Sequence, residues 1–357
     1  MEKERKNVIL ADCEAEEVLT FKQGLEAASG MKFEFLSNVC NRGHGSVWKQ
    51  AKRYGSYFAF PFRIFCRRRR YGVIVGWQQF YANIFAFYCH LFRVRKSNTV
   101  VSVNYTYKRK GGLLGGIYSR FMRFAVNNRH MDHLHVRSGQ YANRCAAELG
   151  VDRNRFLVTT FGIPDEWDRW RDCALPQLPR SAGTKPGAGY VLSIGRSNRD
   201  FDFLTRVWAR PEMADIPLVL IADTYRPRQP LSANVIHLTD VTGEASKPWM
   251  ARCALMVLPI ADGNLASGDT VLLTGMQFEK TVVITRPSTL AEMYITDGED
   301  GVALEKDEEP FAAAILRLMG EDAERRRIGR NARKKYLERF SRHAMGAQIG
   351  RIFGGRG

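Results

Sequence analysis

The second half of the chain alternates short apolar runs with helical segments, and this alternation constrains the fold more than any other feature of the sequence. Runs of four or five apolar residues are typical of buried parallel strands. A repeated strand–helix order predicts a parallel sheet with helices on both faces, an α/β fold. We expect strands at 190–194, 218–222, 235–238, 255–259, 281–284 and 302–304, and helices at 200–208, 270–278 and 310–319.

The first half shows the same pattern less regularly. Strands are expected at 8–11, 32–36, 71–75, 99–103, 133–136 and 156–160, with helices at 79–91, 115–127 and 139–148. The stretch 176–189 is rich in Pro and Gly and is typical of a linker. The sequence therefore predicts two Rossmann-like, doubly wound domains. Their expected order is an N-terminal domain at 1–178, a linker at 179–189, a second domain at 190–335 and a basic C-terminal helix at 336–357.

Positive charge is concentrated in the first half. The chain holds 54 Lys and Arg against 37 Asp and Glu, a net charge of +17, and residues 1–180 contain 30 of the basic and 15 of the acidic residues. No acidic residue occurs between Glu34 and Asp132. A surface of one sign indicates an anionic partner, and we favour lipid headgroups over nucleic acid and over a charged substrate. We therefore expect a cytoplasmic protein that binds peripherally at the cytosolic face of an anionic membrane.

Two further features bear on the cellular compartment. The segment 71–92 carries no formal charge and is long enough to span a membrane, but glycines and amides interrupt it. We interpret it as a buried strand followed by a helix. The seven cysteines are scattered and lack zinc-site spacing, and no signal peptide precedes the first strand. We expect free thiols in a reducing cytosol and no bound metal.

The most informative local motif follows the first strand of the second domain. Gly195 would let the backbone turn close to a ligand, and Arg196 and Arg199 would stand at the carboxyl end of that strand. Fixed guanidinium groups stabilise the negative charge that develops on a departing nucleoside diphosphate. A surface loop with incidental arginines is the alternative interpretation.

Three more places in the second domain, one loop and two single residues, are candidates for binding the nucleoside-diphosphate ligand. A small-residue loop opens a helix, whose N–H groups would face a phosphate unless this is an ordinary capped helix. Thr239 follows a strand whose backbone would meet a base edge, and Glu292 would accept from ribose or sugar hydroxyls. Their alternatives are a plain strand end and a surface glutamate. The loop residues are Ser267, Gly268, Asp269 and Thr270.

The order and spacing of these motifs resemble the nucleotide-binding domain of glycosyltransferase family 4 and its GT-B relatives, the glycosyl transferases group 1. The resemblance runs through SIGR, NVIHLTDV, LMVLPI, ASGDTVLLTGM, KTVVITRPSTLAEMYITDGEDGVAL and RRRIGRNARKKYLERFS. It covers about the last 220 residues well and the first 130 in outline. It implies a GT-B fold with an interdomain cleft, and transfer from a nucleoside-diphosphate sugar with retention. UDP is favoured over GDP, and neither a metal nor another cofactor is expected.

The sequence departs from the family at two glutamates that lie eight positions apart around the small-residue loop. Ala266 and Thr274 occupy these positions. The turn before Glu292 also lacks paired glycines. Two other interpretations therefore stay open, a catalytically inactive GT-B binding module and a nucleic-acid-binding protein.

Candidate acceptor residues lie in the basic first half. Trp77 and Gln78 follow the strand at 71–75, and Tyr105, Arg109 and Lys110 follow the strand at 99–103. Aromatic and amide side chains there would hold a sugar, and the basic pair would hold a lipid pyrophosphate. Loop residues selected for solubility are the alternative. We expect a lipid-linked or saccharide acceptor in the synthesis of a surface polysaccharide or glycoconjugate.

Overall fold

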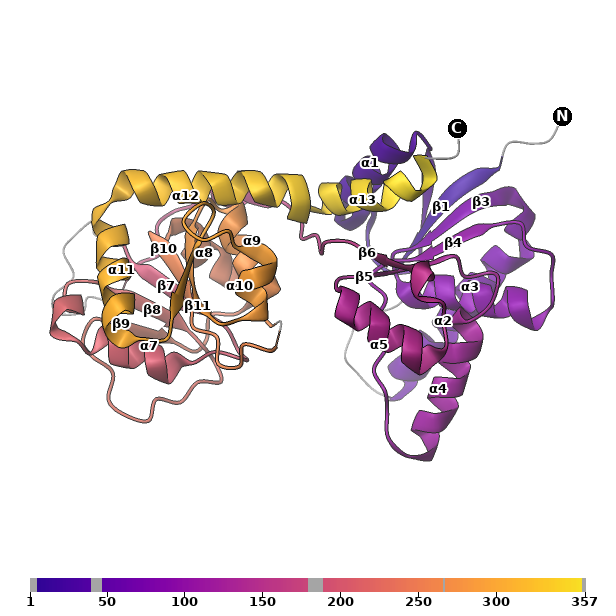
Figure 1. Ribbon diagram of the computed structural model, residues 1–357. Coiled ribbons are helices and arrows are strands. Elements are labelled where there is room, and N and C mark those ends of the chain that lie inside the picture. Colours follow the sequence, from indigo (N-terminus) through magenta and orange to yellow (C-terminus); the bar gives the residue numbers. More distant parts are fainter. Residues whose placement is uncertain (1–4, 40–46, 179–188, 266, 355–357) are drawn as a thin grey trace. The chain divides into compact units, whose positions relative to one another are not determined.

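The computed structural model describes residues 5–39, 47–178, 189–265 and 267–354, and it divides the chain into two compact units (Figure 1). Unit 1 comprises Met1–Pro164 and Ser341–Gly357, and unit 2 is Asp165–Phe340. The division therefore falls before the boundary expected at 178, and the C-terminal helix belongs to unit 1. The expected linker at 179–189 lies outside the described residues except for its last position.

Unit 1 is built on a six-stranded sheet with the order β2-β1-β3-β4-β5-β6, and every neighbouring pair of its strands is parallel. Its strands are β1 Lys6–Ala11, β2 Phe33–Ser37, β3 Tyr71–Gly76, β4 Thr99–Ser102, β5 His133–Val136 and β6 Phe156–Val158. Its longer helices are α1 Ala15–Ser29, α2 Val47–Cys66, α3 Gln79–Leu91, α4 Gly112–Val126, α5 Gly139–Leu149 and α13 Arg342–Gly354.

Unit 2 has a second six-stranded parallel sheet with the order β12-β11-β10-β7-β8-β9. This is the strand order typical of Rossmann folds. Its strands are β7 Val191–Ile194, β8 Leu218–Ile221, β9 Val235–Leu238, β10 Leu255–Leu258, β11 Thr281–Arg286 and β12 Val302–Glu305. Its helices are α6 Trp167–Trp170, α7 Phe201–Trp208, α8 Lys247–Arg252, α9 Asp269–Gln277, α10 Thr289–Tyr294, α11 Glu308–Gly320 and α12 Asp322–Lys335.

The apolar runs of the sequence become strands that are buried on both faces, as parallel strands covered by helices must be. In β10 all four residues, Leu255–Leu258, are buried. In unit 1 the residues of β3 alternate between two cores, with Ile74 facing α3 and α4 and Val75 facing α1 and α13. The predicted α/β fold with two doubly wound sheets is thus confirmed.

Helix α13 returns to unit 1 and packs closely on α1. Glycines make this possible, since a Cβ atom at Gly24 would lie 2.0 Å from the carbonyl oxygen of His343, and one at Gly346 would lie 2.1 Å from that of Phe21. The basic tail that the sequence indicated is therefore part of the core of unit 1.

The uncharged segment 71–92 forms β3 and α3, as predicted. Within the described part of the chain, no helix combines the length and the apolar character that crossing a bilayer requires.

Candidate functional site

The strand order of unit 2 reverses between β7 and β10, and ligands of such sheets bind at the carboxyl ends of the strands beside this switch point. The chain segments that leave the two strands are joined there. Residues Arg199 and Ile260 form an antiparallel bridge, and the backbone N–H of Asp200 donates to the carbonyl of Pro259 at 2.7 Å. The motif after β7 and the loop before α9, far apart in sequence, therefore form one edge.

The guanidinium of Arg199 lies inside this edge, between two glycines. A Cβ atom at Gly195 would lie 2.9 Å from its Nε, and one at Gly268 would lie 2.2 Å from Nη2. Gly268 has φ of 110°, a conformation that L side chains rarely adopt. A larger residue at either position would displace the guanidinium from this place, and at Gly268 it would also strain the backbone.

Arg199 has no carboxylate partner among the described residues, although it is largely withdrawn from water. Its Nη1 donates to the carbonyl oxygens of Ser267 and Asn198 at 3.2 Å each, and its Nε has no hydrogen-bond partner among the residues that the structure describes. Burial lowers the pKa of Arg199 to about 10. A buried cation without a counter-ion is costly, and such groups concentrate at sites that bind an anion.

Arg196, which the sequence placed in the same role, is engaged differently. It is 74 % exposed and binds the carboxylate of Asp223 through Nη2 at 2.8 Å and through Nε at 3.1 Å. Asp223 therefore already neutralises Arg196, and the two predicted arginines are not equivalent.

Asn198, which sequence reasoning missed, holds the loop before α9 in place. Its Nδ2 donates to the carbonyls of Asp262 and Leu265, and its Oδ1 accepts from the backbone N–H of Asp262 at 2.7 Å. It has φ of 55°, in the left-handed region that asparagine tolerates better than most residues. An asparagine beside a Gly-Arg motif was the available signal, but its partners lie more than sixty positions away.

The predicted phosphate loop forms the start of α9. Asp269 and Thr270 begin the helix, and the carboxylate of Asp269 accepts from the N–H of Thr270 at 3.1 Å. Thr274 stands where the family carries its second glutamate, and it is buried with its hydroxyl donating to the carbonyl of Thr270 at 2.7 Å. This threonine is directed into the helix and offers no group to a ligand. Ala266 lies outside the described residues.

Thr239 and Glu292 are not brought to the switch point. Thr239 is exposed and follows β9, the edge strand, which is two strands away from β7. Glu292 is exposed on α10 and lines a shallow pocket with Arg286, Ser288 and Glu305. The nearest link between α10 and the loop before α9 is the hydrogen bond from the N–H of Thr289 to the carbonyl of Gly263 at 2.8 Å.

In unit 1 the strand order reverses between β1 and β3. The side chains at this switch point contact one another. Gln78 donates to the carboxylate of Asp12 at 2.8 Å. Trp77 packs against Phe21 with ring centroids 4.9 Å apart, and the guanidinium carbon of Arg342 lies over the ring of Trp77 at 5.4 Å from its centroid. The ring of Trp77 therefore contributes to packing between the sheet, α1 and α13.

The remaining acceptor candidates divide into a core residue and a surface pair. Tyr105 is 1 % exposed and belongs to the core, although its hydroxyl has no partner. Arg109 and Lys110 line a pocket beside the start of α4, together with Arg123 and Ser119. The structure thus gathers three basic side chains here, of which the sequence had indicated two.

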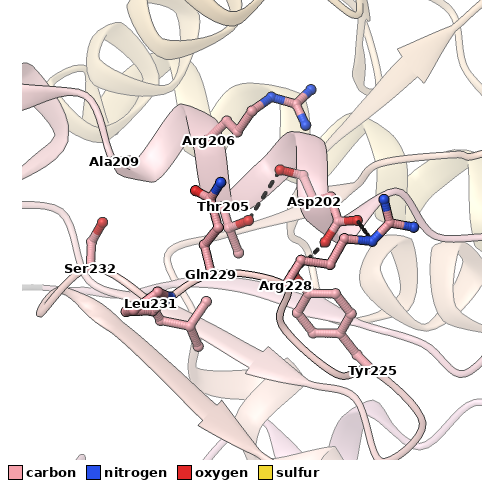
Figure 2. Close-up of a pocket in the computed structure, with 10 residues that line it drawn as sticks. Asp202, Thr205, Arg206, Ala209, Tyr225, Arg228, Gln229, Leu231 and Ser232 are labelled. Atoms are coloured by element: carbon pink, nitrogen blue, oxygen red, sulfur yellow. Dashed lines mark hydrogen bonds and ion pairs between the residues drawn. The ribbon is translucent and has the colours of Figure 1, made fainter.

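A separate pocket of unit 2 lies between α7 and the loop that follows β8 (Figure 2). Its charged groups are paired within the protein. Asp202 accepts from the hydroxyl of Tyr225 at 2.8 Å and pairs with Arg228 at 3.2 Å, and Arg206 binds Glu308 (Figure 2 shows the first two). This pocket therefore lacks the uncompensated charge that distinguishes Arg199.

No group of three or more His, Cys, Asp or Glu side chains that could hold a metal ion occurs in the described ranges.

Comparisons with known proteins concern the family of unit 2 and the fold of the chain. Residues 187–321 match the family model of glycosyl transferases group 1. No curated protein sequence matches the chain significantly.

Several solved structures share the fold over the whole length of the chain. They include Alr3699/HepE of Anabaena in complex with UDP, with 14 % identity, coverage of 97 % of this chain and 99 % of that chain, and a TM-score of 0.55. A glycosyltransferase from Rickettsia africae ESF-5 has 10 % identity, coverage of 99 % and 100 %, and a TM-score of 0.59. WaaG, a glycosyltransferase involved in lipopolysaccharide biosynthesis, has 15 % identity, coverage of 98 % and 100 %, and a TM-score of 0.53.

At these identities the structural likeness establishes the fold, and the family match identifies unit 2. Residues 187–321 of this glycosyltransferase are similar to the glycosyl transferases group 1, and the chain as a whole has the GT-B fold of the solved glycosyltransferases named above.

Proposed function

We propose that this protein transfers a sugar from a UDP-sugar, with retention of configuration, to a lipid-linked or saccharide acceptor at an anionic membrane surface. The observation that carries the proposal is the guanidinium of Arg199, held without a carboxylate partner at the switch point of unit 2. Surface polysaccharide or glycoconjugate synthesis is the corresponding role.

In the proposed reaction, Arg199 binds and stabilises the leaving group, the nucleoside diphosphate. During transfer the bond from the anomeric carbon to the diphosphate oxygen breaks, and the acceptor hydroxyl oxygen bonds to that carbon on the same face, which retains its configuration. The proton of the acceptor hydroxyl passes to the departing diphosphate. Negative charge then grows on the diphosphate, and a fixed cation in a site of low dielectric stabilises it without reorganising. The N-terminus of α9 would add the positive end of its helix dipole. No metal is needed in this scheme, because the guanidinium supplies the charge.

The choice of UDP rests on the relatives. Alr3699/HepE has been solved with UDP, with UDP and glucose, and with UDP-glucose. This chain shares its fold, and its switch-point edge offers a cation where a diphosphate would lie. Thr239 and Glu292 remain candidates for contacts to the base and to the sugar or ribose hydroxyls.

The proposed membrane contact is the exposed side of α4 in unit 1. Leu113, Leu114 and Ile117 lie in its first turns and are 87 %, 80 % and 60 % exposed. The basic run Lys108–Lys110 precedes them in the sequence, separated from Leu113 by two glycines. Adjacent apolar and basic side chains are typical of elements that bind at a membrane interface, where each basic residue contributes about 1 kcal/mol near anionic lipid.

The same region would receive the acceptor headgroup. Arg109, Lys110 and Arg123 line the pocket beside α4, and Tyr107 is the aromatic residue of its lining. Guanidinium and ammonium groups bind pyrophosphate, and an aromatic wall suits a sugar ring. A lipid-linked acceptor would thus present its charged headgroup where its tail meets the membrane.

A thermal-shift panel of UDP, GDP, ADP and their sugars tests the donor assignment on the wild type and on Arg199→Gln. We expect UDP and UDP-sugars to raise the melting temperature of the wild type and to have little effect on the variant. A rise with UDP but no sugar transfer or donor hydrolysis would favour the inactive binding module, which the residues Ala266 and Thr274 leave open. Absence of any nucleotide effect would contradict the proposal.

A further inference from the structure

A second cationic site lies in unit 2 at the opposite edge of its sheet. Arg252 ends α8 just before β10, and Lys280 directly precedes β11, so both lie at the amino ends of the parallel strands. The donor edge lies at their carboxyl ends. The six residues of β11 span about 20 Å at the usual rise per residue, so the two sites are separate.

Four segments bring five basic side chains to one pocket there. Its volume is about 400 Å³, and Trp167, Phe278 and Ala251 supply apolar surface. Helix α12 can approach closely because a Cβ atom at Gly329 would lie 2.0 Å from the carbonyl oxygen of Glu279. The basic residues are Arg171, Arg252, Lys280, Arg326 and Arg330, and Glu279 is the one carboxylate among the lining residues.

Three of these cations have no ion-pair partner within the described part of the chain. Arg171 pairs with Asp168 and Asp172, and Arg326 pairs with Asp322. The ion pairs and side-chain hydrogen bonds found between described residues include none from Arg252, Lys280 or Arg330. Glu279 offsets part of the positive charge of this pocket, and the cations in excess of it repel one another, which favours the binding of an anion.

The ammonium group of Lys280 experiences this repulsion. Burial lowers the pKa of Lys280, and the neighbouring Arg252 lowers it further, while Cys253 and Glu279 act in the opposite direction. A phosphate bound in the pocket would supply negative charge and would therefore raise the pKa of Lys280.

The basic residues of this pocket do not simply reflect an excess of positive charge over the whole of unit 2. Unit 2 contains 24 basic and 26 acidic residues, a net charge of −2, whereas unit 1 accounts for the strongly positive charge of the chain. A concave site of this volume suits a small molecule, whereas a bilayer requires a broad exposed face.

We propose that this pocket is an accessory binding site for a small phosphate-bearing anion, distinct from the donor site. Arg252, Lys280 and Arg330 would bind the phosphate groups, with Trp167 as an apolar wall. The inference does not depend on the identity of the sugar donor, because it rests on residues at the other edge of the sheet.

Calorimetric titration of the full chain with inorganic pyrophosphate tests this site. Saturating UDP is kept in the cell so that the donor edge is occupied, and ionic strength is fixed because salt screens such binding. We expect pyrophosphate to bind the wild type, and the double variant Lys280→Met, Arg330→Gln to bind at least about ten-fold more weakly. Lys334→Gln removes an exposed charge from the same helix and should change the affinity less than two-fold.

Two further measurements separate a binding role from a structural one. UDP affinity should be equal in all three proteins, and without pyrophosphate the melting temperature of the double variant should equal or exceed that of the wild type, because uncompensated charges have been removed. Three results would overturn the proposal: no pyrophosphate binding to the wild type, equal weakening by Lys334→Gln, or unchanged pyrophosphate affinity in the double variant.

Discussion

Units 1 and 2 share a sheet architecture but differ in how they carry positive charge. Unit 1 has 30 basic and 11 acidic residues, a net charge of +19, and unit 2 has a net charge of −2. In unit 1 the charge is spread over exposed segments such as Lys108–Lys110. In unit 2 the informative cation is a single half-buried guanidinium, Arg199, at the switch point.

The two switch points show the same contrast on a smaller scale. At the edge of unit 1, Gln78 binds Asp12 and Trp77 packs on Phe21, so these two side chains are engaged within the protein. The hydroxyl of Tyr105, a buried atom there that has no partner among the described residues, is neutral. At the edge of unit 2, the atom without a partner among the described residues is the Nε of a cation, Arg199. The two edges therefore differ in the charge of these unpaired groups. Many exposed basic side chains indicate that a protein binds a broad anionic surface. A basic side chain that is withdrawn from water and has no counter-ion indicates a site for one specific anion.

The largest expected effect comes from removing the half-buried cation. Arg199→Gln should lower the rate constant of sugar transfer or donor hydrolysis by about 10²–10³, the usual cost of losing one donor that stabilises charge in the transition state. Arg196→Gln should change it less than about five-fold, since Asp223 already binds that side chain. Steady-state kinetics with a UDP-sugar measures both, and equal losses in the two variants would remove the distinction between the arginines.

The next largest effect is expected on membrane binding, when the exposed apolar residues of α4 in unit 1 are replaced. Replacing Leu113 and Leu114 together with Asp should weaken binding to vesicles that contain phosphatidylglycerol by about 30-fold, because two exposed leucines lose their apolar contact. Leu175→Asp is the matched control, since that leucine is 53 % exposed in unit 2. Flotation assays measure the binding. Unchanged flotation of the double variant would show that α4 is not the contact.

Acid should affect unit 1 through His135. Burial lowers the pKa of His135 to about 3, and its neutral ring accepts from the N–H of Asn104 at 3.0 Å and contacts the hydroxyl of Thr159 at 2.8 Å. Because this pKa lies below the unfolded value of about 6.5, the stabilisation is complete above that pH and is lost as pH falls toward 3. Between pH 6.5 and 5 the loss is about 2 kcal/mol of unfolding free energy.

Thermal unfolding of the full chain at pH 7 and pH 5 measures this acid effect. The transition of unit 1 should shift to lower temperature at pH 5, and His135→Gln should reduce the shift. If the variant keeps the full acid dependence, other groups cause it.

The smallest expected effect concerns the loop clamp in unit 2. Asn198→Gly keeps a residue that tolerates positive φ but removes the side-chain hydrogen bonds to Asp262 and Leu265. The expected loss is about 1 kcal/mol of unfolding free energy, with a few-fold weaker UDP binding. Denaturant titration and calorimetry measure the two quantities. Weaker UDP binding without a loss of stability would instead indicate that Asn198 contacts the ligand.

The sequence predicted the sheets well because buried parallel strands leave a strong local signal. The twelve strands coincide with the expected apolar runs within about two residues at each end. The assignment of α13 to unit 1 was missed, since the contact of Gly346 with α1 joins segments more than three hundred positions apart. A sequence pattern indicates which residues of one element are buried, but it does not indicate which other element they pack against.

The candidate site was predicted in part. Gly195, Gly268 and Arg199 were named from their motifs and lie together. Arg196 looked equivalent because the sequence does not show that Asp223, after another strand, neutralises it. Trp77 and Tyr105 follow strands, as ligand-binding residues do, but tertiary packing places their rings in cores. The cationic pocket beside Lys280 left no motif because its residues come from four segments.

The most direct test of the central claim compares UDP with uridine in calorimetric titrations of the wild type and Arg199→Gln. The nucleoside lacks the diphosphate, so the ratio of the two dissociation constants isolates the contribution of the phosphates. We predict that the wild type binds UDP at least about 100-fold more tightly than uridine, and that the ratio falls by at least about ten-fold in the variant while uridine binding is unchanged. A ratio that is the same in both proteins would contradict the assignment of Arg199 to the diphosphate.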